Sequence, residues 1–476
     1  MTDPLRLALV GHTNTGKTSL MRTLLRDTDF GEVSSRPGTT RHVEGARLLA
    51  DGEALVALYD TPGMEDAIAL LDYVDSLAPP AERLDGPARI ERFLASPSAA
   101  TRFEQEAKVL RQLLASDTGL YVVDARDPVL PKHKDELTLL ASCARPLLPV
   151  LNFVRQPDAR EAAWRDALAR LGLHAVVSFD TVAPAIDGER QLYEKLITLL
   201  DAQRPRLERL MKAREREAAQ RREAAARIAA GLLIDTAALR LSVPAEPPSA
   251  LENALARTHE AVRRHEQAAV DRLLALYRFR PGDVRASALP LLDGRWEHDL
   301  FSGETLSQLG IKLGKGAAAG AAAGLGIDLL TGGLSLGAAT AIGAVLGGAW
   351  QTVDKLGERL LARVTGAREL TVDDAVLRAL AARQQLLLQA LEGRGHAALG
   401  PIELGQPDIR RWREEALPEA IAQARAHPEW SALVGDGRHW RDDDARAGAI
   451  SALARDFARA SAGPRRITAS SENRRW

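Results

Sequence analysis

The chain is poor in cysteine, aromatic residues and net charge. Cys143 is the only cysteine among 476 residues, so an internal disulfide and a cysteine-built metal cluster are both excluded. The formal net charge of −1 provides no global field for nucleic acid or membrane, so any such surface must be local. Aromatic residues make up 4% of the chain while Ala, Leu and Arg abound, which indicates mostly helix beyond residue 200. The first predicted strand begins at Leu5 and leaves no room for a signal peptide, so we expect a cytoplasmic protein.

A phosphate-binding loop follows the first apolar run. Gly11–Ser19 reads GHTNTGKTS and fits G-x-x-x-x-G-K-[ST], after the predicted strand Leu5–Val10 and before a predicted helix over Ser19–Leu25. Glycines let backbone N–H groups face a polyphosphate, Lys17 reaches its outer phosphates and the Thr18 hydroxyl can bind Mg²⁺. The start of the following helix adds a positive end. The residues predicted to bind nucleotide here are Gly11, Asn14, Thr15, Gly16, Lys17, Thr18 and Ser19.

Two further segments complete the pattern of a nucleotide switch. Asp60-Thr-Pro-Gly63 ends an apolar strand, where an aspartate can hold Mg²⁺ directly or through water. The Gly63 N–H is a natural sensor of the γ-phosphate. Between the two motifs lies Arg36–His42, RPGTTRH, in which a threonine can close over Mg²⁺ and the γ-phosphate and release them after hydrolysis.

These segments, in this order, resemble those of the TrmE–Era–EngA group of bacterial GTPases over residues 1 to about 180. The resemblance implies GTP hydrolysis with Mg²⁺, and a switch-one ligand at Thr39 or Thr40, with Thr40 preferred. The residues then expected to be catalytic are Lys17, Thr40 and Gly63, and those expected to hold Mg²⁺ are Thr18, Thr40 and Asp60.

Two positions of this resemblance concern how hydrolysis is assisted. Asn14 falls where potassium-dependent members carry a K⁺-ligating asparagine; the alternative is a side chain that only stabilises the loop. Met64 stands where Ras-like GTPases place a water-positioning glutamine. The resemblance therefore implies that a cation such as K⁺, or a homodimer, assists the reaction.

The base-recognition motif departs from the family's Asn-Lys-x-Asp. PVLNFVRQPD supplies Asn152, but Phe153 replaces the lysine and Arg155 the aspartate that normally accepts both guanine N–H donors. Phe153 could stack on the base, and Asp158 could substitute if the loop bends. Ser178 begins the counterpart of the last guanine-loop motif, so Asn152 and Ser178 are expected to bind nucleotide. The family analogy favours GTP over ATP.

Alternating strand-like and helix-like segments predict an α/β domain with a mostly parallel sheet. The predicted strands are Leu5–Val10, Val43–Leu49, Ala54–Tyr59, Leu120–Val123, Leu148–Leu151 and Ala175–Ser178. Glu65–Ser116 is longer than one helix needs and is expected to be a mobile helical insertion.

Beyond residue 202 the chain is expected to be mainly α-helical. The predicted helices are Arg206–Arg227, Leu251–Tyr277, Leu356–Leu391 and Pro418–Ala426, and the basic tail from Ser461 is expected to be disordered. The predicted domains are a GTPase domain, 1–202, a charged helix and linker, 203–249, and a helical domain, 250–476. This layout resembles an uncharacterised bacterial family that joins such a GTPase to a helical C-terminal region.

A Gly/Ala-rich segment, residues 316–353, carries Asp328 as its only charge and repeats glycine every four residues. Small residues at this spacing let helices approach closely, so a helical hairpin is expected. Lysine and arginine flank both ends, as in a hairpin whose ends stay cytoplasmic. The helix Ala317–Leu330 would be about 21 Å long against a hydrocarbon core of about 30 Å. Three interpretations stay open: partial insertion at the inner membrane, packing within a soluble domain, or self-association.

Three functions from different classes follow. The first is a GTP-driven switch that acts at a membrane lipid or membrane protein through residues 316–353. The second is a ribosome- or RNA-associated assembly GTPase, although no KH-like Gly-x-x-Gly or aromatic-basic RNA patch is found. The third is a nucleotide-binding regulatory module with little hydrolysis. The basic face of Arg206–Arg227 can meet lipid or RNA phosphate, or it can simply be solvated.

Overall fold

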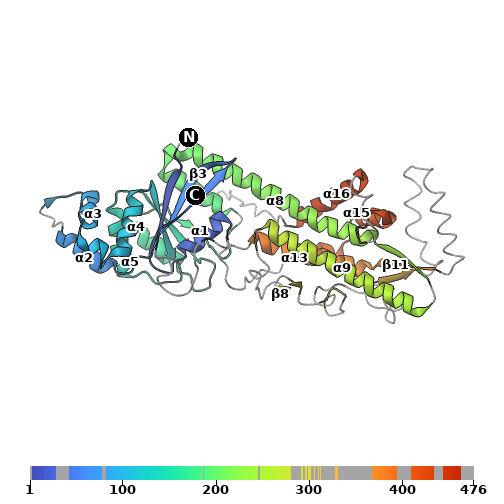
Figure 1. Ribbon diagram of the computed structural model, residues 1–476. Coiled ribbons are helices and arrows are strands. Elements are labelled where there is room, and N and C mark those ends of the chain that lie inside the picture. Colours follow the sequence, from blue (N-terminus) through green and yellow to red (C-terminus); the bar gives the residue numbers. More distant parts are fainter. Residues whose placement is uncertain are drawn as a thin grey trace, which may run out of the picture. The chain divides into compact units, whose positions relative to one another are not determined.

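The protein is described by a computed structural model that divides into two compact units (Figure 1). The structure describes residues 3–27, 30, 42–77, 82–185, 187–244, 247–279, 291–292, 295–296, 299–301, 305, 309, 311, 327–330, 367–393, 409–433 and 443–461. The first unit comprises residues 1–219 and 392–402, and the second comprises 220–391 and 403–476. The division lies inside one long helix, within the predicted linker 203–249, and the predicted domain boundaries stay a prediction.

The first unit is built on the six-stranded sheet that the sequence predicts. Its strands are β1 (Leu5–Val10), β2 (Glu44–Ala50), β3 (Glu53–Asp60), β4 (Thr118–Asp124), β5 (Leu147–Asn152) and β6 (Val177–Ser178). Their order is β2-β3-β1-β4-β5-β6. Every neighbouring pair is parallel except β2 with β3, which form an antiparallel hairpin. The sheet is therefore mostly parallel, as predicted.

Alternation along β1 assigns the two faces of the sheet. Leu5, Leu7 and Leu9 face one hydrophobic core, which they share with α1 (Lys17–Leu25), α7 (Gly188–Leu199) and the first turns of α8 (Arg204–Ala238). Ala8 and Val10 face the other core. That core contains residues of α2 (Ala67–Leu77), α3 (Gly86–Leu94), α4 (Glu104–Leu114), α5 (Pro131–Ala141) and α6 (Glu161–Arg170). Successive strand residues point to opposite faces, so both faces of this sheet are covered.

The predicted insertion between Glu65 and Ser116 is helical in the residues that the structure describes there. It consists of α2, α3 and α4 with a short 3-10 helix, Pro97–Ala100, between the last two. Phe93 and Phe103 are buried and pack edge to face. The helices group beside α5 in Figure 1. The prediction of helix is confirmed, and that of mobility is not tested.

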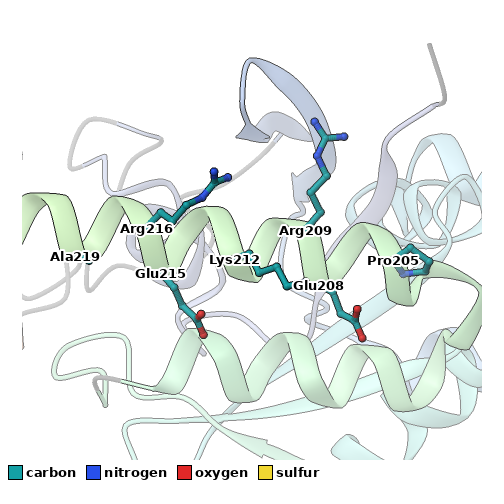
Figure 2. Close-up of a pocket in the computed structure, with 7 residues that line it drawn as sticks. All are labelled: Pro205, Glu208, Arg209, Lys212, Glu215, Arg216 and Ala219. Atoms are coloured by element: carbon teal, nitrogen blue, oxygen red, sulfur yellow. The ribbon is translucent and has the colours of Figure 1, made fainter.

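The tip of the β2–β3 hairpin forms ion pairs with helix α8. Asp51 and Gly52 form the two-residue turn, and both have positive φ, 51° and 80°, as a type I′ turn requires. An Asp51 carboxylate oxygen lies 3.2 Å from Arg216, and Glu53 lies 2.6 Å from Arg209. Figure 2 shows these two arginines on the same side of α8, next to a surface hollow lined by Pro205, Glu208, Arg209, Lys212, Glu215, Arg216 and Ala219.

The second unit is largely helical. Its long helices are α8 from residue 220, α9 (Pro248–Leu276), α13 (Asp374–Gly393) and α16 (Asp444–Ser461), with the shorter α14 (Arg410–Glu414), α15 (Glu419–Ala426) and the 3-10 helix Pro428–Trp430. Two small sheets accompany them: β10 (Ile327–Leu330), β11 (Ala367–Val372) and β7 (Arg240–Pro244) in the order β10-β11-β7, and the pair β8 (Leu291–Leu292) and β9 (Arg295–Trp296). Three of the predicted helices correspond to α8, α9 and α15.

Two helix predictions are wrong in part. The predicted helix Leu356–Leu391 includes the strand β11, and within the described part of this range, 367–391, the helix begins at Asp374. The Gly/Ala segment was expected to be helical, but Ile327–Leu330 form a strand that pairs antiparallel with β11. Pairing to a distant strand satisfies their backbone groups and overrides local helix propensity. The rest of 316–353 lies outside the described residues, as does the tail 462–476. No helix in the described part of the chain is both long and apolar enough to cross a membrane.

A buried ion pair joins α9 to α13. Glu266 and Arg383 are 4% and 3% exposed, and a carboxylate oxygen of Glu266 lies 3.2 Å from the Arg383 guanidinium. Burial raises the pKa of Glu266 from 4.5 to about 7, against the opposing charge of Arg383. Because the folded-state pKa is the higher one, Glu266 contributes stability below pH 4.5 that is lost as pH rises through about 7.

We therefore expect Glu266→Gln to flatten the pH dependence of unfolding. At about 1.4 kcal/mol per pKa unit, the wild type should lose roughly 3 kcal/mol relative to the variant between pH 4.5 and 8. Urea denaturation across this range measures the difference. Glu260→Gln, an exposed position on the same helix, is the matched control. Parallel curves for wild type and Glu266→Gln would contradict the assignment.

Candidate functional site

The predicted phosphate loop connects β1 to α1 and has the backbone its glycines allow. Gly11 has φ 136°, and a Cβ there would lie 2.5 Å from the carbonyl oxygen of Val122. Asn14 and Gly16 also have positive φ, 63° and 91°, and the helix begins directly afterwards at Lys17. The loop therefore curls around the start of α1, which is the arrangement that presents backbone N–H groups to an anion.

Lys17 is a buried cation whose hydrogen bonds go to neutral groups. The residue is only 6% exposed. Its Nζ donates to the carbonyl oxygens of Gly11, at 3.1 Å, and His12, at 2.7 Å. Burial lowers its pKa to about 8, although the charges of Asp60 and Glu136 act in the opposite direction. An ammonium group placed in this way is suited to bind an anion.

Asp60 and Thr18 form the other half of the site. Thr18 Oγ1 donates to Asp60 Oδ2 at 2.5 Å, and Asp60 is 1% exposed. Its second oxygen, Oδ1, is buried and has no hydrogen-bond partner within the described ranges. Burial raises the pKa of Asp60 to about 6. A buried carboxylate oxygen without a partner, next to a hydroxyl oxygen, is a donor set that fits Mg²⁺.

Gly63 and Met64 pack directly on the phosphate loop. A Cβ on Gly63 would lie 2.3 Å from Thr13 Oγ1 and 2.6 Å from Thr13 Cα, so no larger residue fits without a shift of the loop. The Met64 N–H donates to the carbonyl oxygen of Gly11 at 3.2 Å, and the Met64 side chain is buried in the core. Met64 thus belongs to the hydrophobic core. Its thioether has no donor and is only a weak acceptor, so it cannot position a water molecule by hydrogen bonds as an amide does.

A polar network behind the loop was not anticipated from the sequence. His12 Nδ1 lies 2.7 Å from Glu136 Oε1, and His12 Nε2 lies 2.8 Å from Lys132 Nζ. Tyr121 donates its hydroxyl to Glu136 Oε2 at 2.9 Å, and Glu136 is fully buried. The Lys132 ammonium can only donate, so His12 accepts at Nε2 and donates from Nδ1. The network fixes the phosphate loop to α5.

Asn152 ties the phosphate loop to the two loops that follow β5 and β6. Its Nδ2 donates to the carbonyl oxygen of Thr15 at 3.1 Å. Its Oδ1 accepts the N–H of Phe153 and both the N–H and the hydroxyl of Thr181, at 2.9–3.0 Å. The structure therefore brings Asn152 to the phosphate loop, where the sequence predicts it.

Ser178 is engaged elsewhere. Its hydroxyl donates to Glu161 at 2.6 Å and accepts from Arg165 at 2.8 Å, both on α6. Thr181, three residues later and beyond the end of β6, is the residue that reaches Asn152. The nucleotide contact of Ser178 stays a prediction.

Three other residues of the predicted site remain untested. Thr39 and Thr40 lie outside the described residues. Asn14 is exposed, and its side chain makes no hydrogen bond with a described residue. Its K⁺ role stays a prediction.

Comparisons with known proteins match the two parts of the chain separately. A family model described as 50S ribosome-binding GTPase matches residues 6–153, and one described as Domain of unknown function (DUF3482) matches residues 165–455. No curated protein matches the chain.

Solved structures match over 42% of this chain. One is an Era variant from Aquifex aeolicus bound to GDP·AlF₄⁻, with 19% identity and a TM-score of 0.31. Another is Era in complex with MgGDPNP and a segment of 16S ribosomal RNA, with 18% identity and a TM-score of 0.31. The match spans 57% of each of these chains, a little over half their length.

Proposed function

Because this chain belongs to the family of the domain of unknown function DUF3482 and carries an N-terminal P-loop GTPase domain, we propose that it is a GTP-hydrolysing switch that acts on its own largely helical C-terminal region. The observation that carries the proposal is the buried site formed by Lys17, Thr18 and Asp60. A cation held by neutral carbonyls and a carboxylate oxygen without a partner are costly to keep in a nucleotide-free protein. Both become paired when a Mg²⁺-bound triphosphate enters.

Each residue has a defined role in this proposal. Lys17 shifts from the loop carbonyls to the outer phosphates, and backbone N–H groups of the loop bind the remaining phosphate oxygens. Thr18 and Asp60 would hold Mg²⁺, with Thr40 as the further ligand, and the Gly63 N–H would report the γ-phosphate. When bound there, Mg²⁺ would supply charge neutralisation for the transferred phosphoryl group. Since Met64 is buried, positioning of the attacking water requires another group, for which K⁺ at Asn14 or a second copy of the chain are the candidates.

The β2–β3 hairpin offers a direct route from the site to α8. β3 ends at Asp60, and the opposite end of the hairpin contacts Arg209 and Arg216 through Asp51 and Glu53. Leu207 and Leu210 of α8 lie in the same hydrophobic core as residues of β3, on the face of the sheet that α1 and α7 cover. A displacement of β3 that follows the nucleotide state would therefore act on α8, whose residues 220–238 belong to the second unit.

Hydrogen exchange tests this coupling. We expect slower amide exchange over residues 220–238 with a non-hydrolysable GTP analogue than with GDP, and a smaller difference in Arg209→Ala/Arg216→Ala. Exposed ion pairs contribute about 0–1 kcal/mol each, so the difference should shrink rather than vanish. Lys212→Ala, on the same helix and without an ion pair among the described residues, is the matched control. Equal exchange in both nucleotide states would argue against a switch that acts through α8.

The process that the switch serves is addressed by two binding assays. The Gly/Ala composition of residues 316–353 favours a membrane lipid or membrane protein at the inner membrane, which vesicle flotation in each nucleotide state tests. The description of the N-terminal family favours ribosomal subunits as the second candidate, which co-sedimentation tests. GTP turnover measured in K⁺ and in Na⁺, and over a range of protein concentrations, separates cation assistance from assistance by a homodimer.

A further inference from the structure

The loop after β5 borders the phosphate loop and carries Arg155 at the position where the resembled GTPases have the aspartate that accepts from guanine. Arg155 is exposed, and its side chain makes no hydrogen bond or ion pair with a described residue. Arg126, two residues after the end of β4, lies beside the same loop with its guanidinium 4.2 Å from the centre of the Phe153 ring. The Phe153 ring also lies against the phosphate loop, since its Cζ is 3.3 Å from where a Cβ of Gly16 would be.

The carboxylates of this region are occupied by other groups. Asp180 is buried, and its two oxygens accept the backbone N–H groups of Arg155, Val182 and Ala183 at 3.0–3.1 Å. Asp124 forms a bidentate pair with the Arg126 guanidinium, at 2.9 and 2.6 Å. Asp158 is exposed; the pKa of Arg126 is raised chiefly by its hydrogen bonds to Asp124 and, to a smaller extent, by the charge of Asp158. Neither buried carboxylate is free to accept hydrogen bonds from a base.

The chemistry of the purine edge decides what such a loop can select. Guanine presents N1–H and a 2-amino group, which are both donors, and a carboxylate pairs with both at once. A guanidinium has only donors, so it cannot accept either hydrogen bond. Hypoxanthine lacks the 2-amino group, and xanthine carries a carbonyl oxygen in its place, which a guanidinium can bind. A carboxylate that reads guanine rejects a base without the 2-amino group, because one of its acceptors is then left unpaired. A site without such an acceptor cannot reject that base.

We infer that this GTPase holds its base without reading the 2-amino group of guanine, and that Arg155 favours a purine with an acceptor at that position. The inference rests on the proposed nucleotide-binding function and names the determinant of its base selectivity. Stacking and the phosphate contacts then supply most of the affinity. Hypoxanthine and xanthine nucleotides therefore bind to the same site with affinities similar to those of guanine nucleotides.

Competition binding on the full chain tests this inference. A ribose-labelled fluorescent GDP is bound in the presence of Mg²⁺ and displaced by GDP, by IDP and by XDP. We expect dissociation constants for IDP and GDP within about threefold of one another, and XDP at least as tight as GDP. A preference for GDP over IDP of tenfold or more would overturn the inference. Absence of binding by every nucleotide would instead contradict the proposed function.

Three variants locate the determinant. Arg155→Asp supplies an acceptor and should create a preference for GDP over IDP of about tenfold, within the range that one well-placed bidentate contact to a base provides. Arg160→Asp makes the same charge change at another exposed position of this loop and should create no preference. Asp158→Asn should also leave the ratio unchanged. A GDP preference in the wild type that Asp158→Asn removes would show that Asp158 reads the base and would overturn the inference.

Discussion

Asp60→Asn is expected to abolish GTP hydrolysis and, at the same time, to stabilise the nucleotide-free protein. The amide keeps the size of the side chain and can still accept the hydrogen bond from Thr18, but it removes the charge that we propose holds Mg²⁺. Loss of this ligand should reduce turnover by at least roughly 100-fold, as for other groups that stabilise developing charge.

The gain in stability has a separate cause. Asp60 is almost fully buried, Oδ1 has no partner in the described ranges, and burial raises its pKa to about 6. At pH 7.5 the folded protein must therefore keep a desolvated charge that a neutral amide does not carry. We expect a gain of about 1–2 kcal/mol, part of the free energy that this pKa shift represents, and so a melting temperature higher by roughly 2–8 °C.

Thermal melts without nucleotide and turnover assays with Mg²⁺ measure the two effects. Asp72→Asn, at an exposed position of α2, should change neither. If Asp60→Asn melted at a lower temperature than the wild type, Asp60 would be a structural residue. If it kept wild-type turnover, the Mg²⁺ assignment would be wrong.

That Lys17, Thr18 and Asp60 lie together could be predicted from the sequence because each motif is local. Lys17 and Thr18 follow β1 within one short motif, and Asp60 ends a strand that the sequence shows as an apolar run. Parallel neighbours place their carboxyl ends at one edge of the sheet, and the pairing of β1 with β3 brings the two motifs together. The six strands were predicted for the same reason, since each is a short apolar run between turn or helix signals.

Contacts between distant residues could not be predicted in this way. The bond between His12 and Glu136 joins residues that are 124 positions apart, and neither residue type signals the other. Ile327–Leu330 form a strand only because β11 lies beside them, although the surrounding glycines and alanines favour close-packed helices. Thr181 was missed because the partner that identifies it, Asn152, lies on another strand.

Lys17→Ala is expected to have the largest effect on function. The ammonium group is buried, and within the described residues it forms hydrogen bonds to two carbonyl oxygens but no ion pair. In the proposed site the outer phosphates bind this ammonium directly, so its removal should weaken triphosphate binding and reduce turnover by at least roughly 100-fold. Steady-state GTP hydrolysis and binding of a labelled GTP analogue measure both effects.

The same substitution should not stabilise the protein, in contrast to Asp60→Asn. Removing a desolvated cation is favourable, but it takes one of two hydrogen-bond donors from each of the carbonyl oxygens of Gly11 and His12, and a lost hydrogen bond costs about 0.5–1.5 kcal/mol. The two terms oppose each other, so the melting temperature should change little. Lys134→Ala, at an exposed position of α5, is the matched control for both measurements. Wild-type turnover in Lys17→Ala would mean that the buried lysine serves the fold of the loop and that phosphate is bound by other groups.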